Sequence, residues 1–174
     1  FGDHVAVIAE ITDVVHTDES WHSSPSHIIG ADLFLGQMED RSLLTSRHWT
    51  PVRQIEVEAE LVQPIAPPVK RIQEIKPVGI TKLGEAFIVN FGQNINGWTR
   101  LNRLGPAGNK TTITHAEFVG ADGNIDTSHL DAFFPFMPEP IRDHQIDSVI
   151  SAGIDGDYFE PMFTTHGFQY VRVD

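Results

Sequence analysis

Short segments in which hydrophobic and polar residues alternate recur along most of the chain, with turn residues between them. This period of two is typical of strands with one buried face. Segments spaced roughly eight to twelve residues apart predict an antiparallel β-sandwich or barrel. No stretch carries the apolar stripe of a helix of three turns. The expected strands are 5–11, 28–34, 56–61, 71–80, 85–90, 98–104, 111–118, 145–152, 158–163 and 168–173.

The most distinctive stretch is 87–98, where hydrophobic residues run into a polar segment. Gly92 and Gly97 permit backbone angles that bulkier residues resist. The amide side chains of Gln93, Asn94 and Asn96 can hold a corner through hydrogen bonds. Trp98 would then begin the next strand. The stretch therefore predicts a strand–corner–strand unit of a sandwich.

Proline marks the expected domain boundary. Pro64, Pro67 and Pro68 fall close together and predict a stiff, extended connector over 63–69. Residues 1–62 then form a first part and 70–174 a second. Within the first part, the pattern over 37–44 is compatible with a helical turn or an irregular arm.

The net charge and the amino-acid composition limit the classes of binding partner that the chain is expected to have. The chain has 174 residues and a net charge of −12, so its surface repels phosphate backbones and anionic lipids. We expect no nucleic acid and no membrane partner, whereas neutral sugars fit. No apolar run reaches the roughly 20 residues that span a bilayer, and no signal peptide is visible. Cysteine is absent, which excludes disulfides and thiolate metal sites. The compartment stays open.

Asp122, Asn124 and Asp126 alternate as in a calcium loop. The glycine and the later glutamate of an EF-hand are missing, because Thr127 and Phe133 stand in their places. A hairpin turn at Asp122 is the preferred interpretation, with a looser calcium site as the alternative. No other cofactor is expected.

The nine histidines show no spacing typical of a metal site, so no metal ligand set is expected. His115 and His166 are interpreted as structural residues, with sugar contact as the alternative. Carboxylates that could serve in glycoside hydrolysis occur, but nothing pairs them across a sugar. They are Glu117, Asp131, Glu139 and Glu160. We therefore expect no catalytic residue in this chain.

Aromatic residues supply a second kind of candidate contact. Trp98 is interpreted as a core anchor, with sugar stacking as the alternative. Phe133, Phe134 and Phe136 lie in a proline-rich loop over 131–142. They are expected to fold onto one another or onto a neighbouring domain.

Several ordered motifs resemble one protein family. The stretches Asn90–Trp98, Leu104–Gly108, His115–Glu117 and Phe159–Arg172 are similar to the β-sandwich region of bacterial α-L-rhamnosidases, glycoside hydrolase family 78. Upstream, 17–21 and 31–40 resemble the end of the preceding jelly-roll domain. Gln37 and Glu39 depart from that pattern, in which glutamate and tyrosine are usual.

The resemblance implies an all-β protein with a concanavalin-like sandwich and a partial second sandwich at the N-terminus. The family hydrolyses terminal α-L-rhamnose with inversion, using two carboxylates in an α/α barrel that follows the sandwich. That barrel's Asp-Gly-x-x-Arg-Asp stretch does not occur here. The chain is therefore expected to be non-catalytic and to support or dock the catalytic barrel of the same enzyme.

The candidate contact residues, for the barrel or for a rhamnose-containing glycan, are Gln93, Asn94, Asn96, Trp98, Phe133, Phe134 and His166. Two alternatives stay open. The chain could be an independent rhamnose-binding module that uses calcium, or an assembly domain with one apolar face.

Overall fold

The computed structural model describes residues 6–56, 60, 62–131, 133, 135–136, 139 and 143–174. The chain forms two compact units. One contains Phe1–Pro25 and Arg47–Ile72, and the other contains Ser26–Ser46 and Gln73–Asp174. Ser26–Ser46 thus folds with the C-terminal region. The expected boundary at 63–69, and the assignment of 1–62 to a jelly roll, stay predictions.

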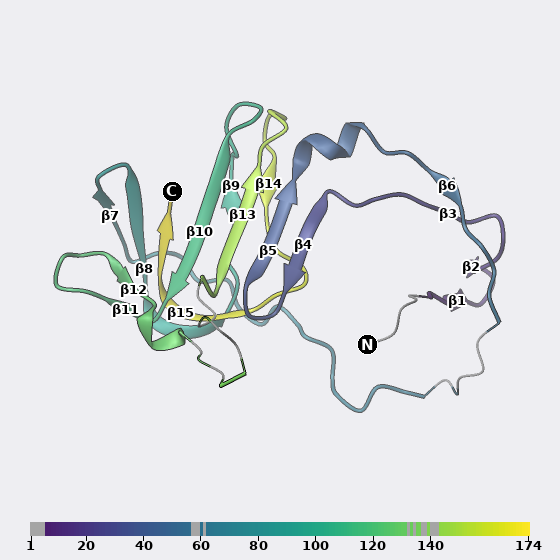
Figure 1. Cartoon of the computed structure of the whole chain (residues 1–174), viewed down its shortest axis with the longest axis horizontal. Helices are drawn as coiled ribbons and strands as arrows, with labels where there is room; N and C mark the ends of the chain where they lie inside the picture. Colours follow the sequence, from purple (N-terminus) through teal and green to yellow (C-terminus); the bar gives the residue numbers. More distant parts are fainter. Residues whose placement is uncertain are drawn as a thin grey trace. The chain divides into compact units, whose positions relative to one another are not determined.

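The larger unit is built on a seven-stranded sheet in the order β4-β5-β13-β10-β15-β8-β7 (Figure 1). Its strands are β4 (Ile28–Asp32), β5 (Gly36–Asp40), β7 (Gly79–Leu83), β8 (Ala86–Gly97), β10 (Lys110–Ala116), β13 (Ile146–Ile150) and β15 (His166–Val173). Neighbouring strands pair antiparallel, except that β5 and β13 run parallel. The expected all-β, mainly antiparallel class is confirmed.

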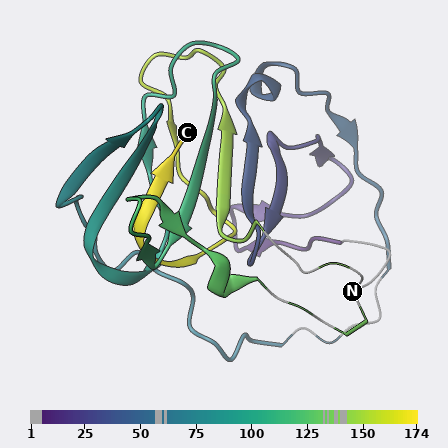
Figure 2. The same cartoon turned by 60° about the vertical axis from the view of Figure 1, so that its left-hand side comes forward.

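Short elements complete this unit. They are the ribbon of β9 (Leu101–Asn102) with β14 (Tyr158–Phe159), the hairpin of β11 (Phe118–Val119) with β12 (Ile125–Asp126), and the 3₁₀ turns η1 (Arg41–Thr45) and η2 (Ser128–Leu130). In Figure 2, β7 and β8 are tilted away from the direction of β5 and β13, as expected for a twisted sheet.

The apolar core lies between the sheet and the β9–β14 ribbon. Its buried members are Leu104, Ile113, Val149, Phe159, Phe168 and Val171. Ile113, Val149 and Phe168 come from three adjacent sheet strands, while Phe159 comes from the ribbon. The edge of Phe91 packs on Phe168 with ring centroids 5.7 Å apart. The ribbon therefore acts as the second layer of the sandwich.

The predicted corner in 87–98 is wrong in detail. Ala86–Gly97 is one continuous strand that carries a bulge, because Asn90 pairs with Tyr170 and Ile95 with Phe168. Residues 91–94 therefore lie opposite Gln169. Gly92 sits at the bulge with φ +77°, and its N–H donates to Asn90 Oδ1 at 2.7 Å. Glycine and amide side chains produce a local kink here, while the strand pairing continues on both sides.

Other segments also differ from prediction. The strand expected over 71–80 begins only at Gly79, the one expected over 158–163 is limited to β14, and the described part of 5–11 is a strand only at Glu10–Ile11. Over 37–44 the helical turn is present as η1, but strand β5 precedes it, because pairing with β13 and β4 satisfies the β5 backbone. The expected strand over 98–104 reduces to β9. The expected strand over 56–61 lies mainly outside the described residues. Among the described residues, no helix is long and apolar enough to span a bilayer.

The smaller unit contains two short antiparallel ribbons. One is formed by β1 (Glu10–Ile11) and β2 (Val15–His16), the other by β3 (His22–Ser23) and β6 (Thr50–Pro51). The Nε1–H of Trp21 donates to the carbonyl of His16 at 3.1 Å. This bond joins the end of one ribbon to the start of the other.

Candidate functional site

Several sequence motifs meet at one end of the seven-stranded sheet. Strand β8 ends there at Gly97, which pairs with His166 at the start of β15. Strand β10 ends there at Ala116, and β13 begins there, with Ile146 paired to Thr114. The parallel strand β5 begins at the same end. The antiparallel topology thus brings residues from distant stretches of sequence together.

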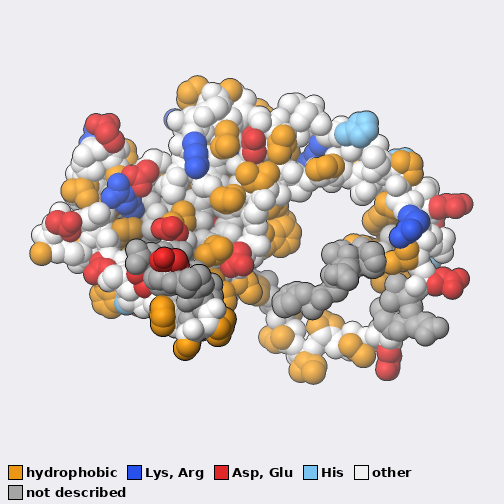
Figure 3. Space-filling view, in the orientation of Figure 1, with side chains coloured by type: hydrophobic (Ala, Val, Ile, Leu, Met, Phe, Trp, Pro, Cys, Tyr) orange, Lys and Arg blue, Asp and Glu red, His pale blue; other side chains and the backbone are white. Residues whose placement is uncertain are grey.

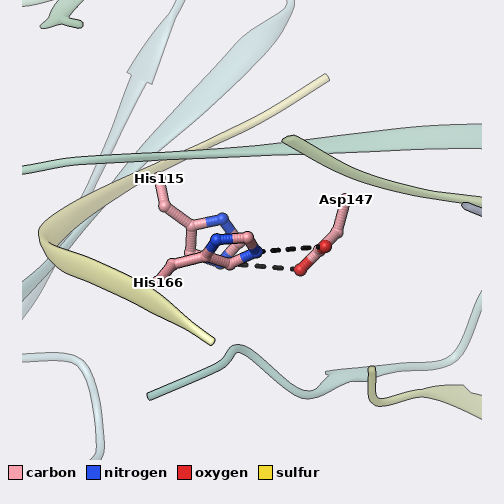
Figure 4. Close-up of side chains that lie close together, drawn as sticks. All are labelled: His115, Asp147 and His166. Atoms are coloured by element: carbon pink, nitrogen blue, oxygen red, sulfur yellow. Dashed lines mark hydrogen bonds and ion pairs between the residues drawn. The ribbon is translucent and has the colours of Figure 1, made fainter. Parts of the chain in front are cut away.

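Beneath this end lies a buried polar cluster of His115 from β10, Asp147 from β13 and His166 from β15. The three are 0%, 0% and 1% exposed. Figure 4 shows the two imidazole rings side by side with the carboxylate facing both. The ring centroids are 4.3 Å apart. His166 Nε2 lies 3.1 Å from Asp147 Oδ1, and His115 Nε2 lies 4.0 Å from Asp147 Oδ2.

The contacts of His115 define its tautomer. Nδ1 lies 3.0 Å from the carbonyl of Gln145, which can only accept, so Nδ1 carries the proton. Nε2 then presents a lone pair that accepts from the Thr99 hydroxyl at 3.0 Å. Burial, reinforced by the neighbouring His166, lowers the pKa of His115 to about 4, although Asp147 and the Gln145 carbonyl oppose the shift. His115 is therefore neutral at neutral pH.

The two oxygens of Asp147 are in different situations. Oδ1 accepts from the Gln37 backbone N–H at 2.8 Å and lies next to His166. Oδ2 is buried without a hydrogen-bond donor among the described residues. Its neighbour at 4.0 Å is the lone-pair nitrogen of His115, too far for a hydrogen bond. A carboxylate oxygen without a donor therefore lies close to a ring nitrogen whose lone pair is engaged by Thr99.

A second buried polar group extends along β5. Gln37, which is fully buried, accepts at Oε1 from the backbone N–H groups of Met162 and Phe163, each at 3.0 Å. Its Nε2 donates to Glu39 Oε1 at 2.8 Å. Glu39 Oε2 in turn lies 2.8 Å from Nε of Arg41. This row of side chains ties the segment before β15 to the edge of the sheet.

On the surface above the buried cluster, Gln93, Asn94 and Asn96 are exposed along β8. Asn94 Nδ2 donates to Glu117 Oε1 at 2.9 Å, and His129 Nε2 lies 3.9 Å from Glu117 Oε2. We call Asn94, Glu117 and His129 the surface triad. The topology thus joins one of the expected contact residues, Asn94, to the acid of the His115–Glu117 motif.

The remaining expected contacts differ in exposure. Trp98 is partly buried, and its Nε1–H donates to Glu160 Oε1 at 2.7 Å, consistent with an anchoring role. Phe133 is 68% exposed, whereas Phe134 lies outside the described residues. His166, interpreted as structural with contact as the alternative, is enclosed, because β15 turns its side chain toward the core.

The residues of the calcium alternative line a hollow of about 490 Å³. Asp122 Oδ1 accepts from the backbone N–H of Asn124 at 3.0 Å. Asp126 Oδ1 accepts from both the hydroxyl and the N–H of Ser128, and these bonds lower the pKa of Asp126. Each carboxylate therefore already stabilises a local turn. Other polar and acidic residues lining the hollow are Thr127, Ser128, Asp131 and Asp143.

Sequence reasoning missed the grouping of His115, Asp147 and His166 because these residues are far apart in sequence. One local signal was available. His115 is two residues after Ile113 on β10, so the two side chains point to the same face of the sheet, and both are buried. The choice of partners depends on strand order, which no local pattern encodes.

On the face seen in Figure 3, acidic and hydrophobic side chains are interspersed and basic ones are sparse.

The chain is similar to known proteins along most of its length. The family model for the bacterial alpha-L-rhamnosidase concanavalin-like domain matches residues 81–174. An alpha-L-rhamnosidase of Streptomyces avermitilis is 26% identical over 193 residues, covering 99% of this chain and 18% of that protein. One from Formosa agariphila is 25% identical over 171 residues, covering 90% of this chain and 17% of that protein.

Solved structures agree. A Streptomyces avermitilis alpha-L-rhamnosidase complexed with L-rhamnose superposes with a TM-score of 0.75 at 27% identity, covering 91% of this chain and 16% of that one. The native alpha-L-rhamnosidase from Aspergillus terreus superposes with a TM-score of 0.74 at 29% identity, covering 92% of this chain and 18% of that one. The chain thus spans less than a fifth of the length of these relatives.

Proposed function

The chain belongs to the bacterial alpha-L-rhamnosidase concanavalin-like domain family, and from this membership we propose that it is a non-catalytic sandwich region serving an α-L-rhamnosidase. The observation that carries the proposal is the match over 81–174 together with the small share of each relative that the chain covers. Its role would be to support and dock the catalytic domain of the same enzyme.

The acids at the motif end of the sheet support a non-catalytic role. Inverting hydrolysis needs two carboxylates separated by roughly 6.5–9.5 Å across a sugar. Asp147 is fully buried, and Glu39 is paired with Arg41 in the interior. Glu117 is partly exposed and accepts a hydrogen bond from Asn94 Nδ2. These three carboxylates therefore stabilise the sandwich and its surface rather than flank a substrate.

We place the docking surface at the surface triad and the adjoining Gln93 and Asn96. Asn96 pairs with Gly167 of β15, whereas Gln93 and Asn94 lie in the bulge of β8, Glu117 directly follows β10 and His129 lies in η2. The hydrogen bond from Asn94 to Glu117 links the bulge to the end of β10 and so restricts the movement of both side chains. They are amides, a carboxylate and an imidazole, which suits the polar character of interfaces between domains of one chain. A docked domain would gain hydrogen bonds without requiring the sandwich to rearrange.

The test uses the complete product of the encoding gene. Hydrolysis of 4-nitrophenyl α-L-rhamnoside is expected, and a product without that activity would overturn the proposal. The double variant Asn94→Ala, Glu117→Ala is then expected to lower the thermal midpoint of the catalytic domain or its activity. The control, Asn102→Ala with Glu85→Ala, removes the same residue types at exposed positions outside the triad. Equal effects in the two double variants would contradict the docking surface.

A rhamnose-binding role is the second candidate, favoured by the polar hollow of about 490 Å³ near Asp122 and Asp126. Carboxylate and amide oxygens suit both sugar hydroxyls and calcium. Calorimetry of the chain with L-rhamnose, with and without calcium, separates the roles. Saturable binding that Asp126→Asn abolishes supports a binding module. Absence of heat under both conditions leaves docking as the function.

A further inference from the structure

We propose that His115, His166 and Asp147 form a closed site for one divalent transition-metal ion of the zinc type. The inference starts from two neighbouring atoms in the interior. Asp147 Oδ2 has no hydrogen-bond partner among the described residues, and it lies 4.0 Å from His115 Nε2, whose lone pair accepts from the Thr99 hydroxyl. A cation bound by both atoms would satisfy the carboxylate charge that burial otherwise penalises.

The donor set suits this class of ion. Two imidazole nitrogens and one carboxylate oxygen are ligands that zinc, cobalt and nickel accept, whereas calcium and magnesium prefer oxygen alone. The ligand atoms that the three residues offer all lie within 4.8 Å of one another. Tetrahedral bonds of about 2.0–2.1 Å separate ligand atoms by about 3.3 Å. The observed 3.1 Å joins His166 Nε2 to Asp147 Oδ1 and the observed 4.0 Å joins His115 Nε2 to Asp147 Oδ2, so binding through one carboxylate oxygen would require the Asp147 side chain to rotate.

Outer contacts hold two of the ligands, His115 and Asp147, whereas His166 Nδ1 is buried without a hydrogen-bond partner among the described residues. His115 donates its other ring N–H to the Gln145 carbonyl, as metal-bound histidines commonly do. Asp147 is held by the backbone N–H of Gln37 at 2.8 Å. The three ligands stand on β13, β10 and β15, which are consecutive strands of one sheet. Their spacing is therefore set by strand pairing rather than by mobile loops.

Burial defines what kind of site this is. The ligands are at most 1% exposed, so the ion would have a structural role and would enter during folding, and a water bound to it would complete the four ligands that such zinc ions take. Binding would take the lone pair that the Thr99 hydroxyl now uses. A buried water that donates to Asp147 Oδ2 is the competing occupant, since such waters satisfy interior polar groups. If a metal occupies the site, a chelator should weaken folding, whereas a chelator should have no effect if the occupant is a water.

The test refolds the full chain from denaturant, with EDTA or with one equivalent of zinc, followed by passage over a chelating resin. The expected result is about one retained zinc per chain, by mass spectrometry, and a higher thermal midpoint than in EDTA. Asp147→Asn keeps an acceptor for Gln37 but removes the charge. It should lower the amount of retained zinc at least about tenfold, because mutating even the residues that hydrogen-bond to metal ligands typically lowers metal affinity by that factor.

His129→Ala is the matched control, because it removes a partly exposed histidine at the same end of the sheet. It should retain zinc like the unmodified chain. X-ray absorption of the zinc-loaded unmodified chain should show two imidazoles, which keeps the test decisive if Asp147→Asn does not fold. Absence of retained zinc, or equal retention by a folded Asp147→Asn chain, would overturn the site and leave the water.

Discussion

Substituting two glycines in neighbouring turns, Gly153 and Gly156, distinguishes the cost of a steric collision from the cost of backbone strain. Gly153 and Gly156 both have φ +73°, a conformation that costs an L-residue about 1–2 kcal/mol. A Cβ on Gly153 would lie 2.8 Å from the backbone N of Ala107, whereas one on Gly156 would meet no heavy atom within 4 Å. Alanine at the two positions therefore incurs the same strain, and only Gly153→Ala adds a collision with backbone.

The collision can be given a magnitude. To relieve it, the turn containing Ala107 must move away from Ser151, whose carbonyl accepts from Gly108 N at 2.9 Å and whose hydroxyl donates to Gly105 O at 2.8 Å. Weakening these two hydrogen bonds costs about 2 kcal/mol, at about 1 each. For Gly156→Ala, reduced unfolded-state entropy offsets about 0.4–1 kcal/mol of the strain. We expect Gly156→Ala to cost about 1 kcal/mol and Gly153→Ala about 3.

The assay is urea unfolding followed by circular dichroism, comparing midpoints at unchanged slope. Both turns lie at the end of the sheet where β10 begins and β13 ends, opposite the buried cluster. The comparison therefore tests the packing without altering the candidate site. If the two variants differ by less than about 0.5 kcal/mol, the scatter of ordinary surface substitutions, the close approach of Gly153 to Ala107 is refuted.

The remaining predictions concern the core and the site. Phe168→Ala should destabilise the larger unit by about 3–5 kcal/mol in the same assay, while Phe133→Ala, at an exposed position, should change it little. Gly36→Ala would place a Cβ 2.1 Å from the Ile146 carbonyl oxygen at φ +119°, so we expect loss of soluble folded protein. In EDTA, the free energy of unfolding should fall as the pH drops from 6.5 toward about 4 and then level off. The reason is that His115 has a pKa of about 4 in the folded chain and 6.5 in the unfolded chain, so only the unfolded chain binds a proton in this range. The loss at full effect is about 3 kcal/mol, and a flat profile over that window would contradict the burial.

The period of two in the sequence was sufficient to predict the class of fold. Over 111–118 it indicated a strand, and Lys110–Ala116 is one, with Thr111, Ile113 and His115 buried on the same face. The strands expected over 28–34 and 168–173 are likewise present as β4 and β15. Alternation reports which residues face a core, so strands with one buried face are the easiest elements to predict.

Strand order and local irregularity could not be predicted in the same way. The parallel pairing of β5 with β13 joins Glu39 to Val149, and no pattern within either segment encodes it. The bulge in β8 arises because residues 91–94 face the single residue Gln169 across the ladder. A polar, glycine-containing run is compatible with either a corner or a bulge, and the pairing partner decides between them.

The position of Gln145 explains why the buried cluster and the surface should be considered together. Its carbonyl accepts from His115 in the interior, and its side-chain Oε1 accepts from the backbone N–H of Gly167 at 2.8 Å. Gly167 pairs with Asn96 on β8, next to the exposed residues of the proposed docking surface. A change that displaces His115 therefore reaches that surface through two hydrogen bonds and one strand pairing. Because the strands are paired along this path, we expect the buried histidines to affect docking through position rather than by contact.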